Sequence, residues 1–453
     1  MLKLRNARVL PPLTELKIYN YNVRLIQFGN EDSFCNGVLT INKEKALEVV
    51  SKVPGIVEPD LHIVKPGDMV RLCPVKEAIE PRARRDGRAL FPGVTGQLSP
   101  CGSGDINALK QCSILVVGKY WGGFQDGLID MGGQGAKYTY FSQLNNLVLV
   151  ADSDDIEEQN EQQKRNTALR NAGMKLAEHV GSIVSGLEAD GVDVYTFTPP
   201  GIGIDNEATL PRAVLVMQLQ TQMETPGYNA LVYGWDGNLM LPMFVNPLSV
   251  LDGAIISGSF MPSSSKWSTY DIQNAPIIRE MLNQNGKTIN FLGVIITNLN
   301  VSLEQKVRAA TICGQLACDL GADCAIVAEE GYGNPDADFM LCLTELERRG
   351  IKTVGLTNEC TGRDGRSQPL MSLDILADAI VSCGNVSELV ELPPLPVIGN
   401  LHALSRDGLS GGWADDEILG PSVREDGSII MENNAMFCGD QVLGWSVKTM
   451  VDF

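Results

Sequence analysis

The feature that most constrains the fold is a repeated order of strand, loop and helix in the last third of the chain. Residues 290–297, NFLGVIIT, form a short run without alternating polar positions. Such a run is typical of a strand buried on both faces of a parallel sheet. The next helix is expected to begin after Ser302, which forms a capping box with Gln305, and to end at Gly321.

The same order is repeated further along the chain. CAIVAE at 324–329 is the next expected strand, and it precedes a helix with Asn334 as its cap and Asp336 in its acidic first turn. KTVGLTNE and AIVSCGN supply two more strands. The pattern predicts a doubly wound, mostly parallel α/β domain over residues 278–453, and such sheets bind ligands at the carboxyl ends of their strands.

Polar residues gather at those strand ends. We predict that the substrate contacts residues of this group, namely Glu330, Asn334, Asp336, Arg363 and Asp364. The acidic first turn already occupies the positive end of its helix, so it favours a cation over a phosphate. Acidic residues at this position also stabilise helices without any ligand, and both interpretations stay open here.

The first two thirds of the chain have a different pattern. Short strand-like runs separated by Pro and Gly predict a β-rich N-terminal domain over residues 1–110. Longer apolar runs and an expected helix over 167–180 predict an α/β domain over 111–277. A glycine-rich insertion in this domain contains Gln125 and Asp126, which we also consider substrate-binding candidates. Its glycines lack the spacing of a dinucleotide fingerprint, so no nucleotide is assigned there.

Charge excludes some classes of partner. The chain has 36 Lys and Arg against 55 Asp and Glu, a net charge of -19, which repels polyanions. We therefore expect neither nucleic acid nor an anionic membrane surface as a partner. Arginines nevertheless cluster after Arg82, in a basic loop of Arg84, Arg85 and Arg88. They could grip a carboxylate or an acidic partner surface, or belong to a solvated loop.

Cysteine and histidine usage indicates a reduced, cytoplasmic protein. The eleven cysteines have no regular framework, and no cleavable signal or long apolar span is visible. The three histidines are isolated, and no two cysteines have the gap of a zinc knuckle. We expect no metal site and no Ser-His-Asp triad.

The stretch 251–270, LDGAIISGSFMPSSSKWSTY, changes character abruptly. Residues 252–257 are expected to form a short buried strand, and Pro262 with its neighbouring serines predicts a loop at the strand end. Serine hydroxyls in such a loop either bond to their own backbone or act as nucleophiles on a strained backbone. Ser259 and Ser264 are the catalytic candidates here.

Several motifs of the chain resemble those of a known protein family. This family is the component B proproteins of glycine, sarcosine and betaine reductases, which supply the α and β polypeptides. The matching stretches occur in family order through nearly the whole chain. They are IEPR and FPG within 79–93, GFQDGLIDM at 123–131, GAKYTYFS at 135–142, DGAIISG at 252–258, GVIITN at 293–298, EGYGNPDAD at 330–338, GRDGRSQ at 362–368 and AIVSCGN at 379–385.

The resemblance implies a pyruvoyl cofactor that this chain is not equipped to make in the family's way. In the family the proprotein is cut before a cysteine, which becomes the pyruvoyl group. Here Ser259-Phe260 stands where Asn-Cys is expected, and Ser264 replaces a downstream cysteine. A phenylalanine has no nucleophile for the required shift. Serine could undergo the equivalent N-to-O shift, which is why Ser259 and Ser264 are retained as candidates.

The resemblance also implies a function. We expect a substrate-binding subunit of an oxidoreductase that cleaves the C-N bond of a small amine or amino-acid-like substrate. A second subunit in a hetero-oligomer would supply the reactive selenol or thiol. A quaternary ammonium substrate could be held by carboxylates or by the indole of Trp235 or Trp267. The alternative is a non-catalytic scaffold that keeps the fold without the pyruvoyl chemistry.

Overall fold

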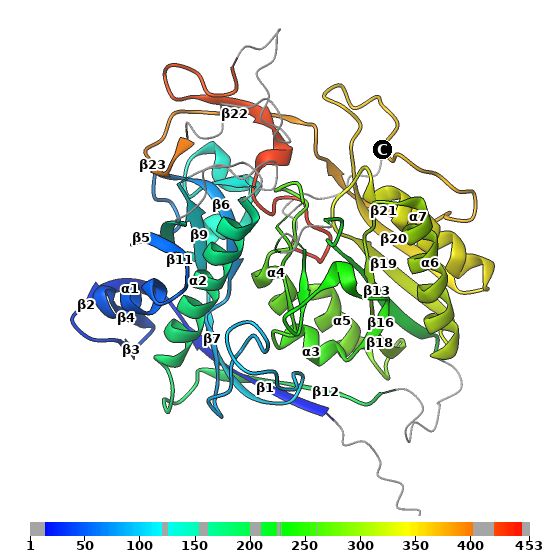
Figure 1. Cartoon of the computed structure of the whole chain (residues 1–453), viewed down its shortest axis with the longest axis horizontal. Helices are drawn as coiled ribbons and strands as arrows, with labels where there is room; N and C mark the ends of the chain where they lie inside the picture. The colour runs from blue at the N-terminus through cyan, green and yellow to red at the C-terminus, as the bar shows by residue number, and fades with distance from the viewer. Residues whose placement is uncertain are drawn as a thin grey trace, which may run out of the picture.

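The computed structural model describes residues 14–119, 126–153, 162–199, 210–223, 227, 229–259, 261–401 and 421–445. Two sheet-centred halves lie next to each other, and helix α4 (Thr269–Asn274) and part of the C-terminal segment lie between them (Figure 1). Mixed sheets with several parallel strands confirm the α/β class. The part of the chain that runs between the halves is therefore placed to contact both.

The larger sheet of the first half has the order β10-β6-β9-β11-β5, and β23 pairs with β6. Alternate residues of β9 enter different cores: Ile114 and Val116 pack with helix α2 (Gln162–Ser182), whereas Leu115 and Val117 face Phe141 on the other side. The strands of this sheet are β5 (Ile56–Val64), β6 (Arg71–Ile79), β9 (Cys112–Gly118), β10 (Gly127–Asp130), β11 (Asn145–Ser153) and β23 (Val397–Gly399).

Two smaller sheets complete the first half. The order is β12-β1-β8-β7 in one and β2-β4-β3 in the other, which carries helix α1 (Lys43–Ser51). The predicted boundary near residue 110 stays a prediction, and β12 pairs with β1 across it. The strands are β1 (Thr14–Asn22), β2 (Leu25–Gly29), β3 (Ser33–Cys35), β4 (Val38–Asn42), β7 (Arg82–Arg84), β8 (Gly104–Lys110) and β12 (Gly191–Phe197).

The second half is organised around a sheet of order β16-β18-β13-β19-β20-β21. The strands expected at 290–297, at 324–329 and in KTVGLTNE lie in it in parallel, as predicted. Strand β13 lies between the first two, and β16 pairs antiparallel with β18. The boundary predicted at 278 is untested, although β13 and β16 precede it. The strands are β13 (Arg212–Leu219), β16 (Met243–Val245), β18 (Asn290–Asn298), β19 (Cys324–Glu329), β20 (Lys352–Glu359) and β21 (Ile380–Asn385).

Both faces of this sheet are covered by helices (Figure 1). Val214 and Val216 of β13 enter a core with helices α6 (Leu303–Asp319) and α7 (Pro335–Arg348). Leu215 and Met217 enter another core with helices α3 (Pro247–Leu251) and α5 (Pro276–Gln284). This two-sided burial explains the absence of polar alternation in the sequence of these strands.

The helix ends follow the sequence with one exception. Ser302 caps α6 by accepting a hydrogen bond from the Gln305 N–H at 3.3 Å, and α7 begins at Pro335 as predicted. The prediction that Asn334 caps α7 with its side chain is wrong, because its backbone is already helical and its side chain makes no cap bond. The carboxylate of Asp336 accepts the Gly333 N–H at 2.6 Å instead.

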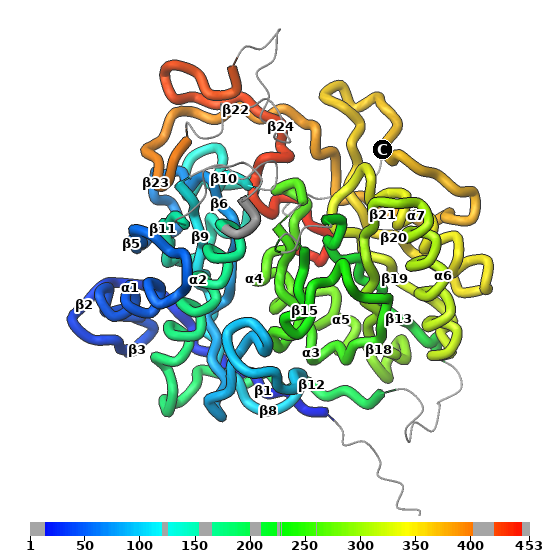
Figure 2. The backbone as a smooth tube through the Cα atoms, in the orientation of Figure 1, coloured from blue at the N-terminus to red at the C-terminus, as the bar shows by residue number. Residues whose placement is uncertain are grey.

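Short elements connect the halves, and the tube in Figure 2 shows the C-terminal segment returning between them. No helix among the described residues has the length and apolar character needed to span a membrane. The remaining elements are the strands β14 (Leu231–Val232), β15 (Trp235–Asp236), β17 (Ile255–Ile256), β22 (Leu389–Leu392) and β24 (Ile429–Glu432), and the 3-10 helices η1 (Gln134–Tyr138), η2 (Tyr140–Gln143), η4 (Gly237–Leu239) and η6 (Asn433–Ala435).

Candidate functional site

The segment 257–269, which we call the serine loop, lies deep in the molecule. The strand before it is shorter than expected, because only Ile255–Ile256 pair as β17. Ser263, Ser264, Ser265 and Trp267 are all fully buried. A segment rich in serine, glycine and proline usually lies at a surface, where water satisfies its backbone groups. This loop must therefore find its polar partners within the protein.

One set of partners comes from β6 in the first half. The Glu77 carboxylate accepts the Thr269 N–H at 3.0 Å, and the Lys266 ammonium donates to the Lys76 carbonyl at 2.5 Å. All three of the charged side chains are buried. These contacts fix the end of the loop to the larger sheet of the first half.

A second set comes from the C-terminal segment. The Ser264 N–H donates to the Asn434 carbonyl at 3.0 Å, and the Cys438 N–H donates to the Ser263 carbonyl at 2.8 Å. Gly127 of β10 permits this packing, because a Cβ at this residue would lie 1.7 Å from the Ser263 hydroxyl. Gly127, the second glycine of the GFQDGLIDM motif, is thus required for the close approach of β10 to the serine loop.

The third set comes from the carboxyl edge of the parallel sheet. Glu330 follows β19, and its two carboxylate oxygens accept the Trp267 N–H at 3.1 Å and the Gln220 N–H at 2.8 Å. Burial raises the pKa of Glu330 to about 7 and is the largest influence on it. The two hydrogen bonds and the charge of Lys266 act in the opposite direction and lower this pKa. Glu330 therefore joins the serine loop to two neighbouring strand ends.

Among the contacts that the structure describes, neither serine candidate is paired with a base. The Ser259 hydroxyl donates to the Gly227 carbonyl at 3.4 Å, and the Ser264 hydroxyl donates to the side-chain oxygen of Asn434 at 3.2 Å. An amide oxygen accepts a hydrogen bond but does not take the proton, so these contacts do not activate a nucleophile. Phe260, at the family's cleavage position, lies outside the described residues.

The residues of the serine loop do not fit the family's pyruvoyl group. The loop contains no cysteine to form it, and its two candidate hydroxyls are bound to amide oxygens. We therefore derive no chemical step through a carbonyl group in this chain. Within the described residues, no cluster of three or more His, Cys, Asp and Glu side chains could hold a metal ion.

The predicted substrate-binding residues are distributed over several places. Asp126 is buried and pairs with Lys76 at 2.5 Å, while Gln125 lies outside the described residues. Arg363 is exposed and pairs with Glu432 of β24 at 2.9 Å, next to the exposed Asp364. The carboxylate of Asp336 accepts backbone N–H groups on both sides, which include that of Met371 at 2.6 Å. Asp336 therefore has a structural role in the described contacts.

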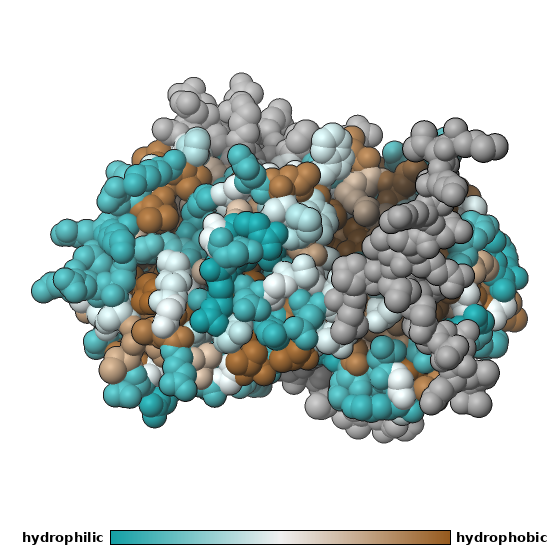
Figure 3. All heavy atoms as spheres, turned by 90° about the horizontal axis from the view of Figure 1, so that it is seen from below, coloured by the Kyte–Doolittle hydropathy of each residue, from teal (hydrophilic) through white to brown (hydrophobic). Residues whose placement is uncertain are grey.

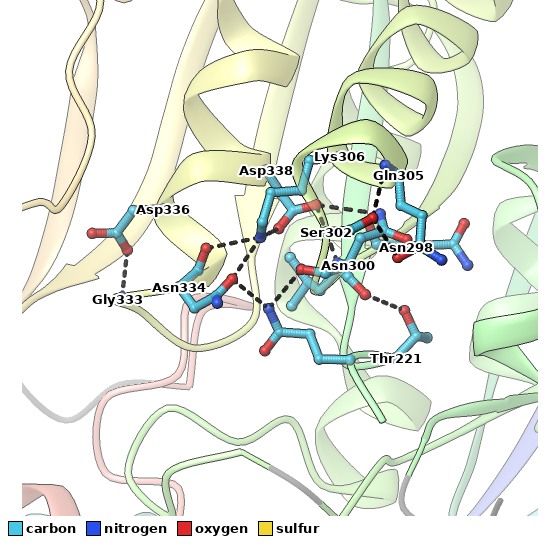
Figure 4. A network of polar contacts seen from close by, with 12 residues as sticks. Thr221, Asn298, Asn300, Ser302, Gln305, Lys306, Gly333, Asn334, Asp336 and Asp338 are labelled. Carbon is cyan, nitrogen blue, oxygen red and sulfur yellow. Dashed lines mark hydrogen bonds and ion pairs between the residues drawn. The ribbon is translucent and has the colours of Figure 1, made fainter. Parts of the chain in front are cut away.

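Asn334 belongs to a polar network at the carboxyl edge (Figure 4). Its side-chain oxygen accepts the Lys306 ammonium at 2.6 Å and the Gln222 amide at 3.2 Å. Lys306 also pairs with Asp338, and both side chains are buried. In Figure 4 the Lys306 side chain extends from α6 toward the first turn of α7. The network thus joins two helix N-termini to the end of β13.

A cavity of about 390 Å³ opens beside this network. Asn334 lines it, but Glu330 and Arg363 do not, so the structure does not bring these three predicted residues together around it. Its lining is largely apolar and combines the serine loop with the ends of three strands: Gln222, Met223, Met261, Pro262, Val301, Tyr332, Asn334 and Pro335. Small ligand sites commonly combine apolar walls with a few polar groups in this way.

Several residues of the site had no clear signal in the sequence. Lys306 and Glu77 lie within ordinary helix and strand patterns, and only their burial in the fold gives them partners. Of the two indoles considered for an ammonium group, Trp267 is fully buried and Trp235 is 61% exposed.

Seen from below, hydrophilic side chains cover much of the surface between smaller hydrophobic patches (Figure 3).

The arginines of this stretch are divided between the interior and the surface. Arg82 pairs with Glu80, and Arg84 pairs with Asp252 at 3.0 Å, with all four side chains buried. Arg85 lies over the Tyr19 ring at 4.0 Å, and Arg88 pairs with Asp86 at 2.7 Å. The interpretation of Arg84, Arg85 and Arg88 as one solvated loop is therefore wrong for Arg84, which is buried against Asp252.

Comparisons with known proteins give matches along nearly the whole chain. A family model described as glycine/sarcosine/betaine reductase component B subunits matches residues 14–451. The betaine reductase complex component B subunit alpha of Peptoclostridium acidaminophilum is 64% identical over 441 residues, which cover 97% of this chain and 100% of that protein. The glycine reductase complex component B subunits alpha and beta of the same organism are 38% identical, over 95% and 98% of the two chains.

A third relative is the sarcosine reductase complex component B subunit alpha of Peptoclostridium acidaminophilum, which is 36% identical over 94% of this chain and 97% of its own length. No solved structure matches the chain. The similarity to the three relatives therefore covers nearly the whole chain at the level of sequence.

Proposed function

The chain belongs to the glycine/sarcosine/betaine reductase component B family, and we propose that it is the substrate-binding subunit of a betaine reductase-type complex. The observation that carries this proposal is the 64% identity to a betaine reductase component B subunit alpha along its whole length. The substrate would be a small zwitterion with a quaternary ammonium group. Its C-N bond would be cleaved by reduction.

A quaternary ammonium substrate accounts for the composition of the serine loop. A carbonyl cofactor weakens a C-N bond by forming an imine, and a quaternary nitrogen cannot form one. Such a nitrogen is already a good leaving group, because it departs as a neutral amine. A subunit for this substrate can therefore function with Ser259-Phe260 in place of the family's Asn-Cys.

The relatives' names support an undivided chain. The betaine reductase relative is called a subunit alpha over a length that this chain covers completely, whereas the glycine reductase relatives are called subunits alpha and beta. We infer that the present chain also works as one polypeptide. Ser259 and Ser264 would then have structural roles instead of forming a cofactor.

In the proposed reaction, this chain holds the substrate and excludes water. A thiolate or selenolate of a second subunit attacks the carbon between the carboxylate and the ammonium. A bond from sulfur or selenium to carbon forms, the C-N bond breaks, and the amine leaves with the electron pair. The second subunit then carries the carboxymethyl group, so the chain would act in a cytoplasmic hetero-oligomer.

The second half of the fold offers the place for the substrate. We propose that its sheet is a doubly wound unit, in which ligands bind beyond the carboxyl ends of the strands. The cavity of about 390 Å³ lies there, between Met261 of the serine loop and Tyr332. Apolar and aromatic walls suit methyl groups on a cationic nitrogen.

The test is release of trimethylamine from betaine by the complex of this chain with its partner subunit, with a dithiol as reductant. We expect release from the complex and none from the chain alone. Release of an amine from glycine or sarcosine, but not from betaine, would overturn the substrate. An inactive complex in which this chain only stabilises its partner would favour the scaffold alternative.

A further inference from the structure

Helix α2 presents a buried guanidinium next to the serine loop. Arg170 is only 3% exposed, and its Nη1 donates to the carbonyl of Ser257 at 2.7 Å and to that of Asn229 at 3.4 Å. Both acceptors are neutral. No carboxylate in the described structure forms an ion pair with Arg170, which is unusual because buried charges are normally paired.

The free part of this guanidinium is the edge that binds carboxylates. Nε and Nη2 of Arg170 have no hydrogen-bond acceptor in the described structure. The same edge of Arg71 binds both oxygens of Asp130, at 2.7 and 2.9 Å. Arg212 uses its own Nε and Nη2 for Asp323, at 3.0 and 2.8 Å. Arg170 thus offers, in the interior, a bidentate site that other arginines of this chain fill with a carboxylate.

A second buried group lies one helical turn earlier. Asn166 is 4% exposed, and neither its side-chain nitrogen nor its oxygen has a partner among the described residues. Residues four apart in a helix lie on the same face, so Asn166 and Arg170 share one face of α2. Leaving such groups unsatisfied in the interior destabilises the folded protein. Two unsatisfied side chains on one helix face indicate a ligand site better than a single one does.

The electrostatics of the surroundings favour a zwitterion. Burial lowers the pKa of the Arg170 guanidinium, and the carboxylates of Glu77 and Asp236 oppose this effect without bonding to it. Glu77 is buried, and its Oε2 has no hydrogen-bond partner in the described structure. A ligand with both a carboxylate and a cationic group would complement Arg170 and Glu77 together.

We propose that Arg170, assisted by Asn166, binds the carboxylate of the substrate, with the Nε and Nη2 edge of the guanidinium facing its two oxygens. This inference rests on the proposed function and deepens it. It divides recognition in two: Arg170 of α2 holds the carboxylate, and the cavity walls at Met261 and Tyr332 take the methyl groups of the ammonium end, whose charge Glu77 balances. Arg170 would also link binding to the serine loop, through its bond to the Ser257 carbonyl.

Calorimetric titration of the complex of this chain with its partner subunit tests the proposal. The probes are betaine and choline, which share the trimethylammonium group but differ in the carboxylate. Arg170→Gln should weaken betaine binding roughly 10- to 100-fold, as expected for loss of a charge-assisted bidentate pair, and change choline binding little. Arg170→Lys, which keeps the charge without the fork, should have an intermediate effect.

Two further variants separate recognition from folding. Arg212→Gln removes the Nε and Nη2 edge of a guanidinium that already binds Asp323. This variant should leave betaine binding unchanged. Asn166→Asp places a carboxylate one turn from Arg170; it should abolish betaine binding without unfolding the protein, because it competes for the guanidinium. This variant decides the question if Arg170→Gln does not fold.

The contrary outcomes are distinct. A folded Arg170→Gln or Asn166→Asp protein that binds betaine as the wild type does would overturn the proposal. Equal weakening of betaine and choline would assign Arg170 to positioning of the loop alone and would also overturn it. Wild-type complex that binds neither probe would instead overturn the proposed function, and this inference with it.

Discussion

The carboxylate of Glu330 accepts the backbone N–H of Trp267 at 3.1 Å, and this bond joins the carboxyl edge of the parallel sheet to the serine loop. The same carboxylate holds the end of β13 through the Gln220 N–H. One side chain thus fixes the position of the loop relative to the strands that border the cavity. The geometry of the proposed substrate region depends on this contact.

Glu330→Gln tests that contact. A glutamine side chain has one acceptor oxygen, so one of the two N–H groups would face its NH₂ group, and we expect a loss of about 1–3 kcal/mol in the free energy of unfolding. Chemical denaturation of the two proteins near pH 5 measures it. A variant as stable as the wild type would show that the two bonds do not hold the loop.

The same variant should change the pH dependence of stability. Burial raises the pKa of Glu330 to about 7 from 4.5, so the folded state holds this proton more tightly than the unfolded state does. The contribution of Glu330 is full below pH 4.5 and is lost as the pH rises toward 7. Glu330→Gln should flatten the stability curve over that range; an unchanged slope would contradict the raised pKa.

Gly127→Ala should destabilise the protein through the serine loop. Its Cβ would lie 1.7 Å from the Ser263 hydroxyl and 3.1 Å from the Phe437 Cα, so side chain and backbone must shift. We expect a loss of roughly 1–3 kcal/mol. Gly191→Ala is the matched control, because its Cβ would meet nothing within 4 Å. Equal melting temperatures for the two variants would argue against the close approach.

Lys306→Met should leave the buried Asp338 without its cation. The expected loss is about 3–5 kcal/mol at neutral pH, as for other buried ion pairs with one partner removed. It should be smaller near pH 5, because burial already raises the pKa of Asp338 to about 6, and loss of Lys306 would raise it further. Denaturation at both pH values measures this.

The control for Lys306→Met lies on the same helix. Arg308 forms an exposed pair with Glu304 at 2.6 Å, so Arg308→Gln should cost less than about 0.5 kcal/mol. If the two variants were equally stable, the Lys306 network would not support the carboxyl edge.

Alanine variants of the two serine candidates should separate structure from chemistry. Ser264→Ala removes a buried hydroxyl bonded to Asn434 and should cost about 1 kcal/mol more than Ser259→Ala, whose bond to Gly227 is long at 3.4 Å. Neither variant should change the mass of the chain other than by the lost oxygen. A variant that remained whole while the wild type was cut would identify a processing serine.

The sequence was sufficient to predict the elements whose pattern is local. The strand at 290–298 follows from its continuous apolar run, and the start of α6 follows from Ser302. The capping role of Asn334 was predicted wrongly, since Lys306, 28 residues away, competes for its side chain. The charge-assisted tertiary contact with Lys306 is stronger than the local capping preference of asparagine.

The candidate site was less accessible from the sequence because its contacts are long-range. Glu330 and Trp267 are 63 residues apart, and Glu77 and Thr269 are 192 apart. The serine loop has the composition of a surface turn, and only these distant partners make its burial tolerable. Arg170 likewise occupies an ordinary helical position, and its unused edge is visible only in three dimensions.

The most direct measurement is the intact mass of this chain, taken from a complex that is releasing trimethylamine from betaine, with and without prior treatment with a carbonyl reagent. We predict one polypeptide near 49.0 kDa, no adduct and unchanged activity. Two fragments with a pyruvoyl group at Ser259 or Ser264, and activity lost on treatment, would contradict the claim that this subunit works without a carbonyl of its own.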